Sequence, residues 1–211
     1  MKTWAALLLV LAAGSGALWQ GTDGFHAVTT EAARRQAVAR APRMLPAATL
    51  QFASGRELPL AQALRQDGRV TIVNFIYTRC NAICSAMGGE LQQLQSRLLA
   101  DGLADRVRLL SISFDPADDA AQLAAYARRM RARPEVWQFA GVADAGQRRA
   151  LLAAFGIVVV PAPLGEFEHN AAFHVVGADG RLARIVDYDA PDAALDLALA
   201  AAAPKLAGLQ R

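Results

Sequence analysis

The chain has 211 residues, of which 54% are hydrophobic and 19% charged, and its net charge at pH 7 is +3. A chain of this length can bury a full hydrophobic core, and the high apolar content excludes global disorder. The positive excess is mild and no basic stripe is interleaved with aromatic residues, so the sequence does not indicate a nucleic-acid-binding protein.

The first twenty residues are expected to export the rest of the chain. Lys2 precedes an apolar stretch from Trp4 to Trp19. That stretch is short for a spanning helix, which needs roughly 20 apolar residues, but suits a signal-peptide core. Ser15-Gly16-Ala17 fits a small-x-small cleavage site, and an uncleaved signal anchor is the alternative. Either case exports the remaining residues to a compartment where disulfides persist.

Residues 21–45 are expected to form a tether, and residues 46–206 one folded domain. Within the tether a short helical pattern runs from Thr30 to Arg40, and Pro42 and Pro46 close the segment. Spacers next to a membrane have this composition, and so do frayed chain termini. If the signal is not cleaved, the N-terminus is therefore expected to hold the domain at the membrane.

From residue 46 onward, strand patterns alternate with helix patterns, and Gly177-Ala178-Asp179-Gly180 predicts a tight hairpin turn near the end. The expected strands are a small hairpin over Leu50–Leu58, then Val70–Ile76, Val107–Phe114, Val136–Phe139, Ala171–Val176 and Arg181–Asp187. The expected helices are Ser85–Ala100, one from just after Asp115 to about Arg131, Ala145–Phe155 and Pro191–Ala203. This order predicts an α/β fold, a three-layer α/β/α sandwich with a mixed sheet and an N-terminal hairpin.

Asp115 follows a predicted strand and precedes Pro116, a pattern typical of the start of a helix. We expect Asp115 to be the N-cap of that helix. Because Asp115 also lies at the sheet edge expected for the cysteines, a hydrogen bond to a metal ligand is the alternative. The far end of the helix is basic, which suits the helix dipole, and docking to an acidic partner or an anionic lipid surface is the alternative there. Its arginines are Arg128, Arg129, Arg131 and Arg133.

The only two cysteines, Cys80 and Cys84, come shortly after the predicted strand Val70–Ile76. A helical pattern begins directly after them, so both sulfurs are expected at the strand-to-helix corner, one turn apart and on the same face. Backbone N–H groups and the positive end of the helix dipole favour thiolates at such a corner. A pair of this kind either forms a disulfide or binds a soft metal.

Of the three histidines, only His169 is expected to lie near the cysteines. His26 is in the tether. A cysteine pair after the first parallel strand, followed by βα units and a final ββα, resembles the thioredoxin arrangement, in which the strand opening the last hairpin runs antiparallel to the cysteine-bearing strand. His169 sits just before that strand, whereas His174 is roughly 16 Å further along and on the opposite face. We therefore expect His174 to be a packed strand residue.

Two thiolates and one imidazole form a low-coordinate soft site that matches copper. Sulfur favours Cu(I), and nitrogen makes Cu(II) tolerable. A structural zinc site would need a fourth protein ligand, and no further Cys or well-placed His is available. An incomplete ligand shell suits a protein that hands its ion on, because a partner's ligand can enter the open position.

Three segments carry a resemblance to the SCO/SenC family of cytochrome oxidase copper-assembly proteins. They are residues 74–84 (NFIYTRCNAIC), residues 111–116 (SISFDP), and Glu168-His169-Asn170 with the strand and turn that come after it. The first is specific, since thioredoxins have two residues between the cysteines and this family has three. Many members carry Pro after each cysteine, where this chain has Asn81 and Ser85, and this departure bears on affinity more than on ligand identity.

The resemblance implies a thioredoxin-like domain tethered outside the membrane, on the periplasmic side of a bacterial inner membrane. It implies one copper ion, Cu(I) or Cu(II), bound by Cys80, Cys84 and His169. The implied partner is the copper domain of cytochrome c oxidase subunit II, with another copper chaperone or a thiol reductase as a further partner. In this role the protein is a metallochaperone and not an enzyme.

Two alternatives remain open. Cys80 and Cys84 can form a redox-active pair that reduces a partner's disulfide, because the i, i+4 spacing allows a disulfide. Against this, no Pro immediately precedes the strand after His169, where thioredoxin-like reductases place one. A purely structural disulfide is disfavoured, because the short loop that it would close yields little stabilisation.

Overall fold

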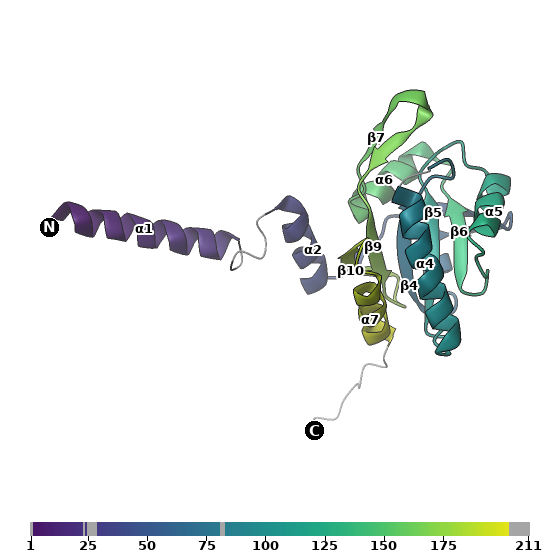
Figure 1. Ribbon diagram of the computed structural model, residues 1–211, viewed down its shortest axis with the longest axis horizontal. Coiled ribbons are helices and arrows are strands. Elements are labelled where there is room, and N and C mark those ends of the chain that lie inside the picture. The colour runs from purple at the N-terminus through teal and green to yellow at the C-terminus, as the bar shows by residue number, and fades with distance from the viewer. Residues whose placement is uncertain (1, 23, 25–28, 81–82, 203–211) are drawn as a thin grey trace, which may run out of the picture. The chain divides into compact units, whose positions relative to one another are not determined.

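The computed structural model describes residues 2–22, 24, 29–80 and 83–202, and the chain divides into two compact units, 1–41 and 42–211 (Figure 1). The first unit contains helices α1 (Lys2–Gly21) and α2 (Thr30–Arg40). Helix α2 confirms the helical pattern predicted from Thr30 to Arg40, and the side chain of Thr29 caps it. In the described parts of the chain, no helix is both long and apolar enough to cross a membrane.

The second unit is built on a mixed eight-stranded sheet with the order β1-β10-β9-β4-β5-β6-β2-β3. Strands β4, β5 and β6 are parallel, and β9 runs antiparallel to β4. The strands are β1 (Arg43–Met44), β2 (Thr49–Phe52), β3 (Glu57–Pro59), β4 (Val70–Ile76), β5 (Val107–Ser113), β6 (Trp137–Gly141), β9 (Ala172–Val176) and β10 (Arg181–Asp187). All residues of β4, β5 and β9 are buried, as expected of central strands covered on both faces.

Helices cover both faces of this sheet (Figure 1). They are α3 (Leu60–Arg65), α4 (Ile83–Ala100), α5 (Ala120–Arg129), α6 (Ala145–Phe155) and α7 (Pro191–Ala202). Successive side chains of a strand point to opposite faces. Asn74 of β4 donates to Met87 of α4, whereas its neighbour Phe75 packs against Phe155 of α6. Helices α4 and α6 therefore lie on opposite faces, which confirms the predicted three-layer architecture.

A series of buried hydrogen bonds fixes α4 over the central strands. The Ser111 hydroxyl donates to the side-chain oxygen of Asn74 at 2.6 Å and accepts from the Trp137 indole N–H at 2.9 Å. The amide nitrogen of Asn74 lies 3.2 Å from the sulfur of Met87. Every group in this chain of contacts has a partner, so it holds β4, β5, β6 and α4 in one register.

The main departure from the predicted elements is a second, small sheet. The sequence patterns predict no strand or helix between Phe155 and Ala171, where prolines indicate a loop. This segment instead forms the hairpin of β7 (Val159–Pro161) and β8 (Phe167–His169), with the 3₁₀ turn η1 (Pro163–Gly165) between them. Prolines at a strand end and in a turn obscure a strand pattern this short. The sequence patterns do not predict the edge strand β1 or the short helix α3 either.

Candidate metal centre

Strand β4 delivers Cys80 to the carboxyl edge of the sheet. After Ile76 the chain leaves the strand through Tyr77 and Thr78, and the Cys80 N–H donates to the Tyr77 carbonyl at 3.3 Å. Cys80 is only 6% exposed. Cys80 thus lies between β4 and α4, at the predicted strand-to-helix corner, and it is buried there.

Cys84 lies in the first turn of α4, which begins two residues earlier than expected. The prediction that the two sulfurs lie one helical turn apart requires both cysteines to be helical residues. Cys80 precedes the helix, so this requirement is not met. The side chain of Cys84, together with Asn81 and Ala82, lies outside the described residues.

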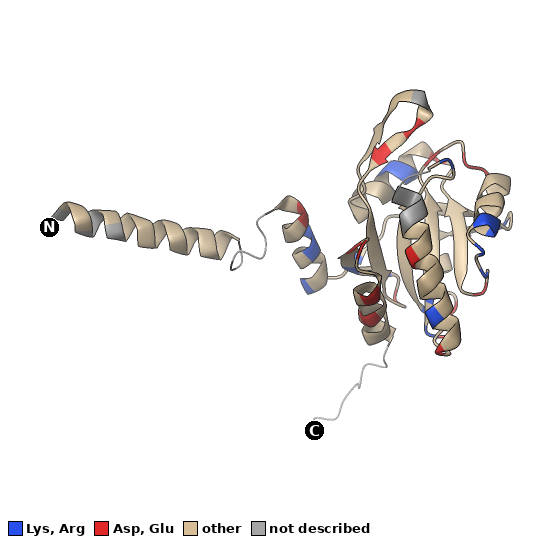
Figure 2. Ribbon diagram, in the orientation of Figure 1, with Lys and Arg blue, Asp and Glu red and all other residues tan. Residues whose placement is uncertain are grey.

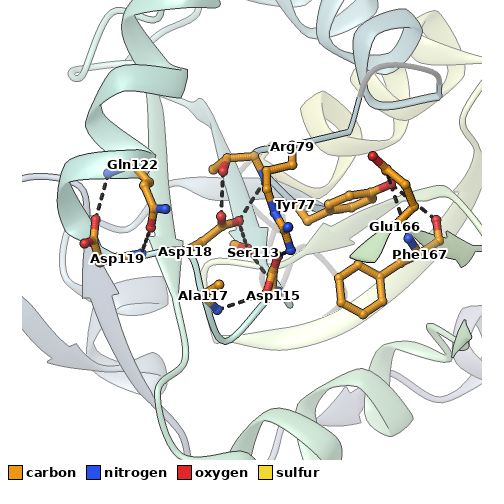
Figure 3. A network of polar contacts seen from close by, with 11 residues as sticks. Tyr77, Arg79, Ser113, Asp115, Ala117, Asp118, Asp119, Gln122, Glu166 and Phe167 are labelled. Atoms are coloured by element: carbon orange, nitrogen blue, oxygen red, sulfur yellow. Dashed lines mark hydrogen bonds and ion pairs between the residues drawn. The ribbon is translucent and has the colours of Figure 1, made fainter. Parts of the chain in front are cut away.

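The backbone next to Cys80 is fixed by the buried carboxylate of Asp118. This carboxylate accepts from the Thr78 N–H at 2.8 Å, the Thr78 hydroxyl at 2.5 Å and the Ser113 hydroxyl at 2.6 Å (Figure 3). Arg129 of α5 donates to the Thr78 carbonyl at 2.9 Å. Thr78 is therefore held on both its N–H and C=O groups, two residues before the thiol. Sequence reasoning missed Asp118, because its partner Thr78 is distant along the chain.

Asp115 is not the helix N-cap, and this prediction was wrong. Helix α5 begins at Ala120, and Asp119 caps it in a capping box with Gln122. The chain makes a turn over Asp115–Asp118 first, closed by the Asp115 carboxylate accepting the Ala117 N–H at 2.9 Å. Asp119 rather than Asp115 has the Gln three residues later that a capping box requires.

The Asp115 carboxylate instead pairs with Arg79, the residue before Cys80. The Arg79 guanidinium lies 2.8 Å from this carboxylate, which is 3% exposed, and Arg79 itself is half exposed (Figure 3). The hydrogen bond and charge of Asp115 raise the pKa of Arg79. The positive charge of Arg79 is thus held in an ion pair with Asp115, one residue before Cys80 in the chain.

His169 lies at the end of β8, paired with Val159 of β7. Its ring makes edge contacts with Phe114, at a centroid distance of 4.9 Å, and with Tyr77, at 6.1 Å. Its Nδ1 is 3.0 Å from the Asn170 carbonyl oxygen. A proton on Nδ1 satisfies that carbonyl and places the lone pair on Nε2, which is the usual arrangement of a metal-binding histidine.

Tyr77 joins the cysteine and histidine segments. Its hydroxyl donates at 2.6 Å to the carboxylate of Glu166, which lies just before β8 (Figure 3). Its ring packs edge-on against His169. Burial raises the pKa of Tyr77 well above its ordinary value, and the hydrogen bond to Glu166 and the neighbouring Cys80 thiol raise it further. The same phenol therefore lies against both Cys80 and His169 in its neutral form.

His174 is a core residue, as predicted. It is 1% exposed and pairs across β9 and β4 with Val73. Its two ring nitrogens lie 3.3 and 3.0 Å from the carbonyl oxygens of Val73 and Phe155. Both nitrogens thus face backbone carbonyls, on the face of the sheet covered by α6. His26 lies outside the described residues.

The donor atoms in the described residues, a thiol and an imidazole, fit a soft metal. A buried thiol and a half-buried imidazole both lie against Tyr77, and the thiol belongs to the class of ligands that copper prefers. No group of three or more His, Cys, Asp or Glu side chains that could hold an ion is found among the described residues, which do not include the side chain of Cys84.

The basic end of α5 is partly used inside the protein. Arg129, besides donating to Thr78, lies over the ring of Tyr126 at 4.9 Å from its centroid. Arg133 pairs with Glu135 on the surface at 2.7 Å. One member of this arginine cluster thus supports the cysteine loop, a role that the sequence did not indicate.

Comparisons with known proteins show the family of the chain. The SCO1/SenC family model matches residues 56–203. A curated relative, the SCO1 protein homolog of Bacillus subtilis (strain 168), is 31% identical over 145 residues, which are 67% of this chain and 71% of the relative.

Solved structures show the same fold. The structure of BsSco, described as a member of the Sco family of cytochrome c oxidase assembly proteins with a disulfide switch, has a TM-score of 0.66 and 26% identity, and the match covers 78% of this chain and 96% of BsSco. Copper-bound ScoI from Arabidopsis thaliana has a TM-score of 0.63 at 15% identity, over 74% and 98% of the two chains.

Proposed function

Because the chain belongs to the SCO1/SenC family, we propose that it is an exported copper metallochaperone for cytochrome c oxidase. It takes copper through Cys80, Cys84 and His169 and helps to assemble the dinuclear copper centre of oxidase subunit II. The observation that carries the proposal is the position of Tyr77. Its carbonyl accepts the Cys80 N–H at 3.3 Å, its hydroxyl donates to Glu166, and its ring packs against the His169 ring. Segments that are 89 residues apart in the chain, at Tyr77 and Glu166, meet there.

The expected ligand set leaves copper open to transfer. Two thiolates stabilise Cu(I), and the imidazole makes Cu(II) acceptable. Three protein ligands do not complete a tetrahedral shell, so a cysteine or histidine of the oxidase copper domain can enter before the ion leaves. The thiols must be deprotonated to bind, a change that the N-terminal end of α4 favours.

Copper can enter only when the cysteine pair is reduced. A Cys80–Cys84 disulfide removes both thiolates from the ligand set, so the redox state of the pair acts as a gate. The disulfide switch described for BsSco, a relative of 26% identity, supports this part of the proposal.

The same relative gives a reason to keep a second function, thiol–disulfide exchange with the oxidase copper-site cysteines. One thiolate attacks the partner disulfide, a mixed disulfide forms, and the second cysteine resolves it. The products are an oxidised Cys80–Cys84 pair and two partner thiols, so two electrons move to the partner. This reaction needs no histidine, which separates it from metal delivery.

Export and membrane attachment belong to the proposal as well. The apolar segment of residues 4–19 serves as a signal peptide or signal anchor, and residues 21–45 as the tether, so that the domain acts on the periplasmic side of a bacterial inner membrane. A cysteine-accessibility assay with an impermeant thiol reagent on intact cells tests this placement.

A copper titration of the reduced full-length protein, followed by transfer to an apo oxidase copper domain, tests the function. We expect one copper per chain, strongly weakened Cu(II) binding in His169→Ala, and nearly unchanged binding in His26→Ala. His174→Ala is expected to bind copper almost as wild type does. Since that change also leaves two buried carbonyls without their partner, its folding is checked by circular dichroism.

Equal Cu(II) affinity in wild type and His169→Ala would remove His169 from the ligand set. Reduction of the oxidase disulfide by His169→Ala at the wild-type rate, together with no copper transfer by wild type, would favour the exchange reaction instead.

A further inference from the structure

The hairpin that carries His169 is a separate small sheet. Among the described residues, β7 and β8 pair with each other and with no strand of the main sheet. At its base, Asn170 accepts the Val158 N–H at 2.7 Å and donates to the Gly156 carbonyl at 2.9 Å. These contacts shape the hairpin itself, so its position against the cysteine loop depends on side chains.

One face of the hairpin packs on the end of the central strands. Phe167 and His169 alternate with the exposed Glu168, so they point to the same side. Phe167 meets the rings of Tyr77 and Phe114 at 5.2 and 5.6 Å. Edge-to-face ring contacts hold these surfaces together but tolerate small sliding movements.

The directional contacts between the two segments converge on the Tyr77 hydroxyl. It lies 2.6 Å from the Glu166 carboxylate and 3.4 Å from both the N and the O atoms of Phe167 (Figure 3). The turn is also adjacent to Arg79, since a Cβ added to Gly165 would lie 3.4 Å from a guanidinium nitrogen. The hairpin segment 159–169 carries acidic residues and no Lys or Arg, so Arg79 attracts it (Figure 2).

We infer that Tyr77 is a positioning residue for the copper site: its hydroxyl, through Glu166, fixes the distance between the histidine hairpin and the cysteine loop. The inference rests on the proposed copper function and adds a residue that binds no metal itself. Residues that orient metal ligands typically contribute about 10–100-fold in metal affinity. The hydroxyl, rather than the ring, is the part expected to matter for His169.

The test compares Tyr77→Phe with Glu166→Ala, Glu166→Gln and the double variant Tyr77→Phe/Glu166→Ala, all in the full-length reduced protein. Tyr77→Phe keeps the ring contacts and removes the hydrogen bond, and Glu166→Gln keeps an acceptor oxygen. We expect a loss of about 10–100-fold in Cu(II) affinity in Tyr77→Phe and in Glu166→Ala, no further loss in the double variant, and rescue in Glu166→Gln. Tyr188→Phe, at an exposed tyrosine, is the matched control and should bind as wild type does.

Two readouts separate positioning from general destabilisation. The nitrogen hyperfine coupling of bound Cu(II) in electron paramagnetic resonance should weaken in Tyr77→Phe, while the sulfur-to-copper absorption band remains. In the metal-free protein, hydrogen exchange should rise at Phe167–His169 and stay unchanged in β4 and β5.

The possible outcomes are distinct. If the wild type binds copper and Tyr77→Phe has the same copper affinity and nitrogen coupling, the inference is overturned and the proposed function stands. Additive losses in the double variant would also overturn it, because two independent contacts would then be at work. No copper binding by the wild type would contradict the proposed function, and the hydrogen exchange of the metal-free protein would still report whether Tyr77 holds the hairpin.

Discussion

At the scale of single residues, the site depends on buried polar side chains that bind no metal. Three of them are largely buried: the exposed fraction is 9% for Asp118, 5% for Asp115 and 3% for Tyr77. Asp118 accepts from Thr78 and Asp115 pairs with Arg79 in the loop that ends in Cys80, and Tyr77 begins that loop. A buried carboxylate is stable only with hydrogen-bond partners, so these contacts specify one loop conformation.

Asp118→Ala should therefore cost far more stability than its size suggests. It removes three hydrogen bonds to a carboxylate and leaves the Thr78 N–H and hydroxyl and the Ser113 hydroxyl without their acceptor. We expect the free energy of unfolding to fall by about 2–4 kcal/mol, since one hydrogen bond to a charged group contributes roughly 1.5–3 kcal/mol. Urea unfolding of the reduced protein measures this loss.

The exposed Asp105 provides the control for that experiment. Asp105→Ala should change the free energy of unfolding by less than about 0.5 kcal/mol, as surface substitutions commonly do. Similar losses in the two variants would show that Asp118 does not hold the cysteine loop.

At the scale of elements, helix α5 and the hairpin β7–β8 are the parts whose exact limits matter for function. The start of α5 at Ala120 leaves Asp115 available for Arg79. The turn η1 brings Glu166 within reach of Tyr77. A one-residue change in either element would separate a cysteine-loop contact from its partner.

The two acidic residues before α5 should respond differently to substitution. Asp119→Ala removes the N-cap and should lower the free energy of unfolding by about 1 kcal/mol. Hydrogen exchange at the Gln122 N–H, which donates to the Asp119 carboxylate at 2.8 Å, should rise in the same variant. Asp115→Ala should leave hydrogen exchange in the first turn of α5 unchanged. If exchange there rises as much as in Asp119→Ala, Asp115 also caps the helix.

Two glycines with positive φ offer a matched test of the hairpin. Gly165, with φ of +75°, adjoins Arg79, whereas Gly55, with φ of +81°, lies in the β2–β3 turn with open space around it. Alanine at either position should lower the free energy of unfolding by about 1–2 kcal/mol, the cost of left-handed backbone for an L-residue. Only Gly165→Ala should also weaken copper binding in a competition titration. An equal loss of copper affinity in Gly55→Ala would show that the effect is not specific to the hairpin.

At the scale of the whole molecule, the central strands bring the segments of the candidate site to one edge of the sheet. Strand β4 carries the cysteine loop, and β9, antiparallel to it, brings the chain back from the histidine hairpin at the same edge. Since ligands are expected from segments on both sides of this edge, copper should bind the folded protein and not the unfolded chain.

Copper should therefore raise the stability of the reduced protein. At a free copper concentration about 100 times Kd, the free energy of unfolding should rise by about 2.7 kcal/mol, and a chelator should reverse the effect. Thermal unfolding followed by circular dichroism measures this change. The oxidised protein, in which a disulfide occupies the thiolates, serves as the control, and equal stabilisation of both forms would argue against the cysteines as ligands.

Much of the fold could be predicted from local patterns. Strands β4 and β10 and helix α6 have the expected limits, and β5, β6 and β9 lie within a residue or two of theirs. Buried strands consist of continuous β-branched and aliphatic runs, and helices begin and end at capping residues, so both signals are contained in short windows of sequence. The burial of His174 could be predicted from the direction and register of one strand.

By itself, the sequence determined the order of the main strands and helices, the buried strand that leads to the cysteines, and the burial of His174, because strand period and direction are local properties. The tertiary structure alone decided that Asp115 pairs with Arg79, that Asp118 fixes Thr78, and that Tyr77 meets Glu166, Cys80 and His169. These contacts join residues up to 92 positions apart, such as Tyr77 and His169, and no periodicity along the chain encodes them. They arise only when the packed sheet brings the ends of separate strands to one edge.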